Sequence, residues 1–460
     1  MSDILEQLVG LLGAKSVLVG DDISARNVSY WDNSPLLAMA IVRPESTEDL
    51  AAVMALCHQQ GQNLVPQGGR TNLVESCLST ADDIIISLEK MNNIVSLDEV
   101  NYTVTVEAGL ILETLQNTLA ESHLMFPMDF GARGSCTIGG ILATNAGGTM
   151  VLKYGMARAL LLGVEVVLPD GTIISSLNES LKNNTGYDLN NLFCGSEGTL
   201  GVITKAVLRL WDQPMSRSTA LLACDSFENL TTLLKTFQSR LPGGLSAYEV
   251  MWNEYFKLNA SSLMPGREPI ASDYNYYVLA EYAGGDQALD GEAFNAVLES
   301  AFEQSLIVDG VVVKTESERE ELWQIRDNPE PLEHSRGEWA CFDVSLKISS
   351  MESFTDQLKA QVDGYSQVNE VYIYGHLGDG NLHLAIWAER EGQPFIEDIE
   401  LLVYTLVKKF SGSISAEHGI GLEKRKWLSY SRSQNELALM RRIKTTFDPA
   451  EMMNFGKILQ

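Results

Sequence analysis

The chain has 460 residues, of which 45% are hydrophobic and 20% are charged, and its formal net charge at pH 7 is −28. By the rough guide of about 150 residues per domain, this length allows two or three domains, and the composition is that of a folded protein. The strong negative charge argues against nucleic acid or an anionic membrane surface as a partner. No run of about 18 apolar residues is present, so we expect no transmembrane segment.

The N-terminus and the cysteines both indicate the cytoplasm. Residues 1–6 are acidic, unlike the basic start of a secretion signal or an Arg-rich transit peptide. The six cysteines are spread singly, without a C-x-x-C pair, which predicts reduced thiols rather than a disulfide framework or a zinc finger. We therefore expect a cytoplasmic protein whose cysteines are small packing residues.

Early in the chain, a helix is predicted to begin after the N-cap residue Ser46 and to stop at Gly61. A short strand, residues 63–66, then leads into Gly68 and Gly69. Paired glycines at a strand end let backbone N–H groups approach an anionic ligand closely, because no Cβ stands in the way. Alone, such a pair is more often an ordinary turn.

Two further glycine-rich segments, residues 131–148 and 183–204, add weight to that signal. Small residues and hydroxyls at this density make a poor core, but they suit a groove in which the backbone lies against a long polar cofactor. No G-x-G-x-x-G sequence follows a predicted strand, so a Rossmann dinucleotide site is not supported. The three segments together predict a cofactor groove of another type.

Residues 371–387 are predicted to form a β-hairpin, with β-prone runs at both ends and the two-residue turn signal Asp379-Gly380 between them. If these two residues form a type I′ turn, His376 lies directly opposite His383 on one face, with Cβ atoms roughly 4.5–5.5 Å apart. Two imidazoles so placed can bind one metal ion.

The stretch 415–421 places Glu417 beside His418. Neighbouring side chains of an extended chain point to opposite faces, so we do not expect both to bind the same ion. We expect His376, His383 and Glu417 to bind a divalent ion, with zinc preferred over manganese and iron, and His418 to remain available as a base. Two nitrogens, one oxygen and open positions suit a catalytic metal site.

The alternative for any single one of these histidines is an ordinary polar residue, and for one histidine alone we prefer it. Three of the six histidines of the chain fall in these two stretches, however. Chance scatter is a poor explanation of that clustering, so the functional interpretation is preferred for the set.

The segments singled out so far resemble a known flavoprotein superfamily. Residues 66–73, 135–148 and 195–204 look like the FAD-binding domain of the vanillyl-alcohol oxidase and p-cresol methylhydroxylase superfamily. Residues 375–383 and 417–421 resemble its branch of FAD-linked D-2-hydroxyacid dehydrogenases, which includes D-2-hydroxyglutarate dehydrogenase, D-lactate dehydrogenase and the flavin subunit of glycolate oxidase. The resemblance covers nearly the whole chain.

This resemblance implies an α+β fold in three parts. Residues 1–214 are expected to form a PCMH-type FAD-binding domain of two subdomains, and residues 215–425 a substrate or cap domain with an antiparallel sheet flanked by helices. Residues 426–460 are expected to return to the FAD domain. In that tail, Phe455 replaces the proline of the usual Asn-Pro-Gly-Lys ending.

The same resemblance implies which residues contact FAD, all of them in the glycine-rich segments or the tail. They are Pro66, Gly68, Gly69, Arg70, Thr71, Asn72, Ser135, Thr137, Ile138, Gly139, Gly140, Thr144, Asn145, Gly147, Glu197, Gly198, Gly201, Val202, Ile203 and Asn454. The chain departs from the family at Asn72, Glu75 and Ser76, where glycines are common. No histidine lies in the three segments, so we expect FAD without a covalent link to the protein.

For the chemistry, the resemblance implies oxidation of a D-2-hydroxy acid by hydride transfer from its C2 atom to N5 of the flavin. The substrate carboxylate and hydroxyl are expected to chelate the metal ion, while His418 takes the hydroxyl proton. Arg326 matches a family arginine that clamps the substrate carboxylate, and Asn381 could hydrogen-bond it. An exposed helix arginine and an ordinary turn asparagine are the alternatives for these two residues.

The choice of substrate is left open between two kinds of acid. Cys341 and Glu330 stand where D-2-hydroxyglutarate dehydrogenases carry a substrate-binding lysine and a threonine, which favours acids with small side chains, such as D-lactate. Lys347 could compensate, so D-2-hydroxyglutarate dehydrogenase proper remains an alternative.

Two alternatives come from other classes of protein. A non-redox alkyl transferase like alkylglycerone-phosphate synthase would carry a histidine run where this chain has residues 415–418, and a catalytically silent flavin-binding or metal-binding protein is the other. For the dehydrogenase, an electron-transfer flavoprotein or a quinone is the expected electron acceptor, and a homodimer is an expected assembly.

Overall fold

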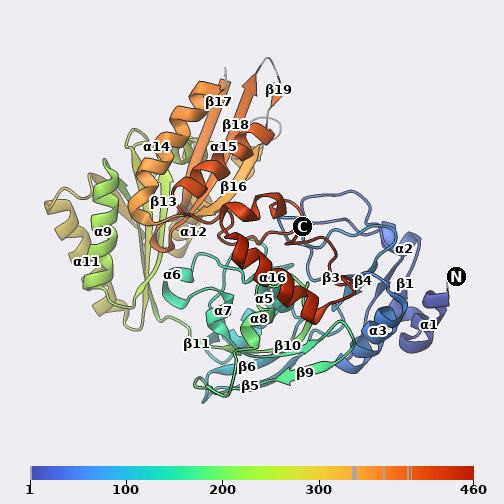
Figure 1. Ribbon diagram of the computed structural model, residues 1–460. Coiled ribbons are helices and arrows are strands. Elements are labelled where there is room, and N and C mark those ends of the chain that lie inside the picture. The colour runs from blue at the N-terminus through green and yellow to red at the C-terminus, as the bar shows by residue number, and fades with distance from the viewer. Residues whose placement is uncertain (1–2, 334–338, 366–367, 391–392, 395) are drawn as a thin grey trace. The chain divides into compact units, whose positions relative to one another are not determined.

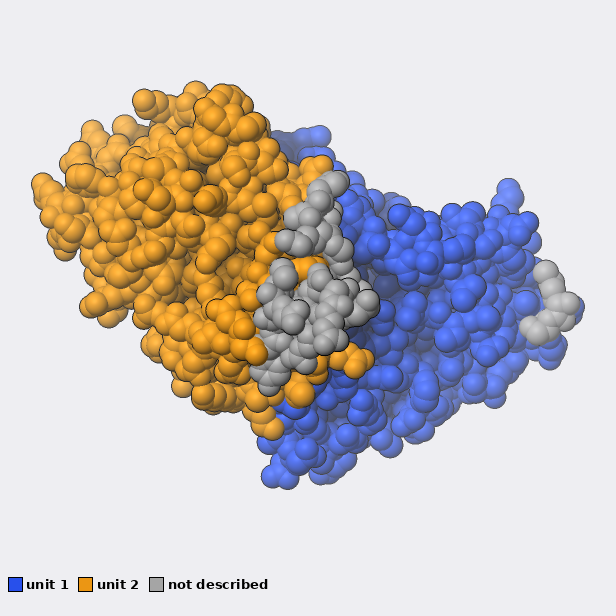
Figure 2. Space-filling view, turned by 90° about the horizontal axis from the view of Figure 1, so that it is seen from above, with its two compact units in different colours: residues 1–148, 155–213, 417–460 blue, residues 149–154, 214–416 orange. Residues whose placement is uncertain are grey.

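The computed structural model describes residues 3–333, 339–365, 368–390, 393–394 and 396–460. Helices and strands are mixed along the chain (Figure 1), so the α+β class expected from the sequence is confirmed. The chain divides into two compact units, coloured separately in Figure 2. Unit 1 comprises residues 1–148, 155–213 and 417–460, and unit 2 comprises residues 149–154 and 214–416.

The first half of unit 1 is built on a four-stranded sheet of order β1-β2-β4-β3. Strands β2, β4 and β3 are parallel, and β1 pairs with β2 in antiparallel fashion. Strand β4 is buried along its length, as its continuous apolar run predicts for a parallel strand. The elements are α1 (Asp3–Leu12), β1 (Val17–Leu18), α2 (Asp21–Ser24), β2 (Ala40–Val42), α3 (Thr47–Gln60), β3 (Leu64–Gln67) and β4 (Ile84–Ser87).

Helix α3 shows how local sequence sets these bounds. The side chain of Ser46 accepts a hydrogen bond from the amide of Asp49 at 3.1 Å and so caps the first turn. At the other end, Gly61 takes the left-handed conformation with φ of 66°, which glycine adopts without steric cost. The helix predicted between these two signals is confirmed.

The second half of unit 1 is a five-stranded antiparallel sheet of order β5-β6-β10-β8-β9 with short helices. Strands β7 and β11 form a separate pair. The elements are β5 (Ile94–Asp98), β6 (Thr103–Glu107), α4 (Leu112–Ala120), β7 (Leu124–Met125), α5 (Ile138–Thr144), α7 (Ala157–Leu160), β8 (Leu161–Val167), β9 (Ile173–Ser176), α8 (Asn190–Phe193), β10 (Val202–Arg209), β11 (Trp211–Asp212) and α16 (Gln434–Phe447).

The last residues of the chain pack beside β3 of the first sheet. The amide of Leu64 donates to the carbonyl oxygen of Met452, and the amide of Asn454 donates to the carbonyl oxygen of Leu64, each at 2.8 Å. These bonds continue the parallel pairing with a bridge between Leu64 and Met453. The C-terminal tail is therefore part of unit 1.

Unit 2 is built on one antiparallel sheet of order β15-β12-β14-β13-β17-β18-β16, to which β19 adds beside β18. Its elements are α6 (Val151–Tyr154), β12 (Ser216–Cys224), α9 (Phe227–Arg240), β13 (Leu245–Trp252), α10 (Asn253–Leu263), β14 (Tyr276–Gly284), α11 (Gln287–Glu303), β15 (Asp309–Val312), α12 (Glu316–Asp327), α13 (Glu330–Glu333), β16 (Ala340–Ser345), α14 (Ile348–Tyr365), β17 (Val368–His376), β18 (Asn381–Arg390), β19 (Gln393–Pro394) and α15 (Ile396–Lys409).

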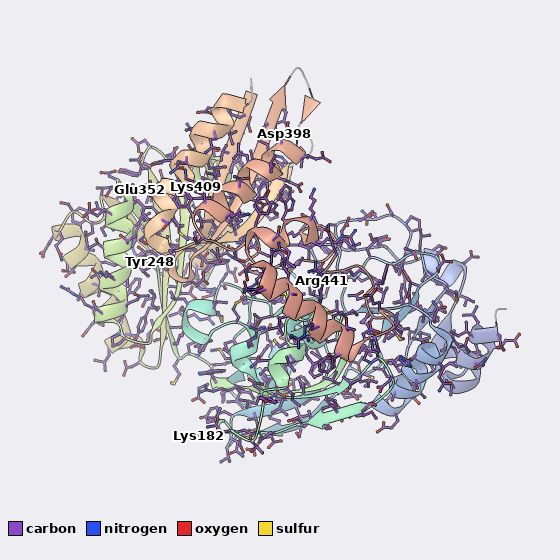
Figure 3. The ribbon with its side chains drawn as sticks, viewed as in Figure 1. Lys182, Tyr248, Glu352, Asp398, Lys409 and Arg441 are labelled. Atoms are coloured by element: carbon purple, nitrogen blue, oxygen red, sulfur yellow. The ribbon has the colours of Figure 1, made fainter. Side chains whose placement is uncertain are left out.

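The two faces of this sheet carry different helices. On one face, the buried Tyr248 of β13 donates its hydroxyl to the carbonyl oxygen of Leu230 in α9 at 2.8 Å (Figure 3). Because successive side chains of a strand point to opposite faces, Met251 of β13 lies on the other face, where it packs with residues of α10 and α12. That second face carries the candidate site. Among the described residues, no helix is both long enough and apolar enough to cross a membrane.

Candidate active site

Two histidines lie on neighbouring strands of the sheet, but not in the predicted register. Tyr374, and not His376, pairs with His383. The predicted two-residue turn is wrong, because residues 377–379 form a 3-10 turn and only Gly380 is left-handed, with φ of 89°. Since strand side chains alternate with a period of two, a register shift of two residues keeps both histidines on one face. Their ring centroids are 5.3 Å apart.

A buried carboxylate fixes the first of these histidines. Glu249 of β13 lies opposite His376 of β17, on strands that run side by side in Figure 1. Its two oxygens lie 2.9 and 2.8 Å from Nδ1 of His376. Burial alone raises the pKa of Glu249, but the charges and hydrogen bonds of His376 and Arg326 outweigh that effect and lower the pKa below its ordinary value. Glu249 is therefore ionised and orients the imidazole.

The second histidine also has a buried carboxylate beside it. Asp343 of β16 pairs directly with His383 in the sheet, and its Oδ1 atom lies 4.0 Å from Nδ1 of His383. The other oxygen, Oδ2, accepts a hydrogen bond from the amide of Ala416 at 3.1 Å. Carboxylates behind histidines are the usual partners of metal-binding imidazoles. Asp343 therefore lies where a carboxylate partner of His383 would lie, and it also binds the backbone of Ala416.

Sequence reasoning missed both carboxylates, although a signal existed. Glu249 lies in β13, a strand that is buried along its length, and Asp343 lies between the buried Phe342 and Val344 of β16; each carboxylate is 1% exposed. A buried charge is costly unless it is paired, so a lone acidic residue inside an apolar strand indicates a partner elsewhere in the chain. The sequence alone does not say which partner.

Arg326 lies at the end of α12, where helix α10 holds the backbone in place. The hydroxyl of Tyr255 donates to the carbonyl oxygen of Arg326, and the side-chain amide of Asn259 donates to that of Ile325, both at 2.8 Å. The Arg326 side chain is 4% exposed, so the alternative of an exposed helix arginine is wrong.

The Arg326 guanidinium meets the same carboxylate as His376. Its Nε atom donates to Oε2 of Glu249 at 2.9 Å, and Nη2 lies 2.7 Å from that oxygen. Burial works against the charged form, but the charge of Glu249 more than offsets it and raises the pKa of Arg326. Nη2 is buried and makes no well-aligned hydrogen bond to any described residue. Nη2 carries two N–H groups, so the one directed away from Glu249 is left for a ligand carboxylate.

Asn381, the first residue of β18, is a second buried polar group of this kind. It is 4% exposed, and neither its side-chain oxygen nor its side-chain nitrogen has a hydrogen-bond partner among the described residues. Buried polar groups are nearly always satisfied, so an unsatisfied one is explained well by a bound molecule. Both residues predicted on unit 2 to bind substrate thus carry polar atoms available to a ligand.

The chain passes from unit 2 to unit 1 between Ala416 and Glu417. One peptide bond joins these residues, so their Cα atoms are about 3.8 Å apart. The amide of Ala416 is bonded to Asp343, and Asp343 is paired with His383, so the chain leaves unit 2 beside the strand that carries this histidine.

Within unit 1, the loop that carries His418 is anchored to the glycine-rich segments. Glu197 accepts hydrogen bonds from the amides of Ile420 and Gly421 at 2.8 and 2.9 Å, and also from the hydroxyl of Ser76. Burial raises the pKa of Glu197, against these hydrogen bonds. The Glu197 carboxylate therefore holds the loop, and a contact of this side chain with FAD stays a prediction.

The predicted cofactor segments converge within unit 1. A Cβ on Gly68 would lie 2.4 Å from Oγ1 of Thr137, and one on Gly69 would lie 1.9 Å from the carbonyl oxygen of Ser135. Gly198 is packed against Pro66 in the same way, at 3.1 Å. Only glycine permits this close approach, so the segments around residues 66–69, 135–140 and 198 lie against one another.

Further predicted residues are engaged in local structure. The Thr144 hydroxyl donates to the carbonyl oxygen of Gly140 within α5. Asn145 ends that helix in the left-handed conformation and accepts a hydrogen bond from the amide of Arg158 at 2.9 Å. Asn72 accepts from the amides of Val74 and Ser76. The remaining predicted residues on these segments are Thr71, Ile138, Gly139, Gly147, Gly201, Val202 and Ile203.

Two polar groups of unit 1 suit an anionic, hydrogen-bonding cofactor. Asn454 donates to the carbonyl oxygens of Ser76 and Glu197, at 3.0 and 2.6 Å, while its own buried oxygen has no partner among the described residues. Burial, and then the nearby charge of Arg26, lower the pKa of Arg70, and no described residue forms an ion pair with it. An anion such as a pyrophosphate would supply the missing negative charge. The residues present therefore fit FAD.

Comparison with known proteins agrees with these features. Residues 38–176 match the family model described as "FAD binding domain", and residues 213–458 match "FAD linked oxidases, C-terminal domain". A probable mitochondrial D-2-hydroxyglutarate dehydrogenase of Oryza sativa subsp. indica is 35% identical over 460 residues, which are 100% of this chain and 82% of the relative. A putative mitochondrial D-lactate dehydrogenase of Schizosaccharomyces pombe is 35% identical over 441 residues, 94% of this chain and 84% of the relative.

Solved structures agree in fold. An alkyldihydroxyacetonephosphate synthase superposes with a TM-score of 0.75 at 17% identity, covering 99% of this chain and 85% of the other. A substrate-bound p-cresol methylhydroxylase superposes with a TM-score of 0.73 at 15% identity, covering 98% and 95%. At these identities the likeness shows the fold alone, and it confirms the expected PCMH-type fold. The chain belongs to the FAD-linked oxidase family of oxidoreductases, together with the relatives named D-2-hydroxyglutarate and D-lactate dehydrogenases.

Proposed function

We propose that the protein is an FAD- and metal-dependent dehydrogenase that oxidises a D-2-hydroxy acid to the 2-oxo acid. The observation that carries this proposal is one buried network on the sheet of unit 2, in which Glu249 joins a histidine of the pair to Arg326. The network sets an imidazole suited to a metal ion beside a guanidinium suited to a carboxylate. Such a combination recognises a 2-hydroxy acid, whose carboxylate and hydroxyl are adjacent.

His376, His383 and Glu417 are the proposed ligands of a divalent ion, with zinc as the first choice. Two imidazoles with ring centroids 5.3 Å apart can each direct one nitrogen to a shared ion. Glu417 directly follows Ala416, the residue at which the chain leaves unit 2 beside Asp343. A divalent ion held there would lower the pKa of the substrate hydroxyl.

Arg326 and Asn381 are proposed to bind and orient the substrate. The buried Nη2 of Arg326 donates to the substrate carboxylate, as suits a guanidinium already held by Glu249. Asn381 satisfies its buried amide by a second hydrogen bond to the substrate. These contacts fix the direction of the C2–H bond.

His418 is the proposed base, which accepts the proton of the substrate hydroxyl at an imidazole nitrogen. Its loop is held by Glu197, and Asn72 donates to the carbonyl oxygen of His418 at 3.4 Å. Bound FAD supplies the hydride acceptor, and we propose that it is held without a covalent link. The glycine-rich segments and Asn454 are proposed to bind it.

We propose that small D-2-hydroxy acids are better substrates than D-2-hydroxyglutarate. Cys341 lies two residues before Asp343 on β16, so its side chain is on the same face as the histidines. A thiol there cannot pair with a second substrate carboxylate, and Glu330 would repel one. Cys341 and Glu330 are both exposed, so the missing ion pair is worth up to about 1 kcal/mol, and kcat/KM for the dicarboxylate should be lower by up to about fivefold.

The electron acceptor, the assembly and the functional domain bounds expected from the sequence are also proposals. An electron-transfer flavoprotein or a quinone is the proposed electron acceptor, and a homodimer the proposed assembly. The functional domains are proposed at residues 1–214, 215–425 and 426–460. The cytoplasm stays a prediction that is not confirmed, because several relatives are named mitochondrial. The alkyl transferase gains no specific support, since the likeness to such an enzyme is one of fold.

The test is anaerobic reduction of the bound flavin, which is measured as the loss of its visible absorbance. D-Lactate and D-2-hydroxyglutarate are each compared with their L enantiomers. The D acids should bleach the flavin, D-lactate with the higher kcat/KM when a dye serves as acceptor. A flavin that no D-2-hydroxy acid bleaches would contradict the proposed activity. A clear preference for the dicarboxylate would contradict only the proposed selectivity.

A further inference from the structure

Glu249 is given no role of its own in the proposed reaction, although its position suits one. It is a carboxylate in the middle of β13, 1% exposed, and it contacts two proposed functional groups at once. Nδ1 of His376 lies within 2.9 Å of it, and Nε of Arg326 lies at 2.9 Å. These partners are 127 and 77 residues away in the sequence. Glu249 thus connects a proposed metal ligand, His376, with a proposed substrate-binding residue, Arg326.

The contact with His376 decides which imidazole nitrogen is available. Both oxygens of Glu249 lie within 2.9 Å of Nδ1 of His376, so Nδ1 is the nitrogen that carries a proton and donates it to the carboxylate. The lone pair is then on Nε2, at the opposite side of the ring. A histidine fixed in this tautomer is a prepared metal ligand.

The contact with Arg326 decides the orientation of the guanidinium. Nε and Nη2 both approach Oε2 of Glu249, so the plane of the fork is set by that oxygen. The ring of Tyr374 packs against the guanidinium, with its centroid 4.9 Å from Cζ. The remaining N–H group of Nη2 therefore has a fixed direction.

We propose that Glu249 is a positioning residue that holds His376 ready for the metal ion and Arg326 ready for the substrate carboxylate. This inference rests on the proposed function. Because one carboxylate supports both groups, its loss should weaken metal binding and raise the KM for the hydroxy acid together. Glu249 itself touches neither the ion nor the substrate.

The test is the variant Glu249→Gln, which keeps the size of the side chain and removes its charge. Zinc affinity is measured on the resting, FAD-loaded protein by competition with a chromogenic chelator, which needs no turnover. Loss of a group that supports a metal ligand should weaken zinc binding about 10- to 100-fold. The KM for D-lactate should rise as well, and Glu249→Asp should restore part of both. Zinc affinity equal to that of the unmodified protein would overturn the inference.

Glu281→Gln is the matched control. Glu281 is also a buried carboxylate of this sheet, on the neighbouring β14 and on the same face. It pairs with Arg319 at 2.6 Å and accepts from Trp323 and Thr219, none of which is a proposed site residue. Its variant should lose stability but keep the original zinc affinity. An equal loss of affinity in both variants would assign the effect to folding and overturn the inference.

A measurement on the unmodified sequence covers the case in which Glu249→Gln does not fold. Nitrogen-15 labelling of histidine reports the tautomer in the metal-free protein, with the His376 signal identified by its loss in His376→Gln. A proton on Nδ1 supports the role of Glu249, and a proton on Nε2 overturns it. If the unmodified protein binds no divalent ion in the competition assay, the proposed metal dependence fails, while the tautomer still decides the role of Glu249.

Discussion

At the scale of single residues, the three clustered histidines have different surroundings. His376 and His383 lie on the sheet of unit 2, whereas His418 lies on a loop of unit 1. His376→Ala and His383→Ala should each remove most of the bound ion, because each deletes a proposed ligand. His418→Ala should keep the ion and lose turnover. Elemental analysis and kcat test this together, and a metal-free His418→Ala protein would exchange the roles of Glu417 and His418.

Another residue-scale prediction concerns pH. The hydrogen bond from Arg26, with further help from Arg43, lowers the pKa of Glu89 to about 2 from 4.5. A carboxyl group whose pKa is lower in the folded state stabilises the fold above its unfolded value, about pH 4.5, and loses that contribution as the pH falls toward 2. The Glu89 side chain is 38% exposed, so solvent screening should keep the contribution near or below about 1 kcal/mol.

Glu89→Gln should therefore lower the free energy of unfolding at pH 7, and by less than half as much at pH 3. Urea unfolding of both proteins at the two pH values measures the difference. A deficit of the same size at both would show that charge pairing is not its cause.

At the scale of elements, the connection between β17 and β18 sets the histidine pair. Gly380 has φ of 89°, and a Cβ there would lie 2.7 Å from the carbonyl oxygen of Leu346. Gly380→Ala should lower the free energy of unfolding by about 1–2 kcal/mol and weaken zinc binding, since the turn must shift. Denaturant unfolding and the chelator assay measure the two effects. Unchanged stability would mean that the turn adapts without strain.

Gly364→Ala, a glycine substitution in another element of unit 2, serves as the control for Gly380→Ala. Gly364 lies in helix α14, and a Cβ there would meet no atom within 4 Å. Alanine is favoured over glycine inside a helix by roughly 0.5–1 kcal/mol, so this variant should be slightly more stable. Its zinc affinity should not change.

At the scale of the whole molecule, unit 1 is completed by residues from both ends of the chain. Asn454 donates to the carbonyl oxygens of Ser76 and Glu197, and Lys457 donates to that of Leu78 at 2.7 Å. Deleting residues 454–460 should therefore reduce the FAD bound per chain, because the segment 183–204 and the chain that follows the segment 66–73 lose a common support. The ratio of visible to protein absorbance after gel filtration measures FAD content.

Phe455→Ala is the control for the deletion. Phe455 is 59% exposed, so its side chain should contribute little to the tail. FAD content should stay as in the unmodified protein. A truncated protein that retains all of its FAD would show that the tail is dispensable for the cofactor.

The sequence by itself determined the features that depend on near neighbours. Helix α3 begins and ends where Ser46 and Gly61 predict, because capping involves residues within one turn. The placement of His376 and His383 on one face also follows from the sequence, since alternation survives a register error of two residues. The family was identified from residue order in the glycine-rich and histidine stretches, and the comparisons confirm it.

Only the tertiary structure decided which distant residues become partners. Local sequence cannot show that β13 lies beside β17, so the contact between Glu249 and His376 was not predicted. The hairpin register was wrong for a related reason, because the Asp379-Gly380 signal describes an isolated turn. In the folded protein Gly380 must also fit against the carbonyl oxygen of Leu346. Strand pairing over long sequence separations is set by the packing of the whole sheet, and the buried charges follow from it.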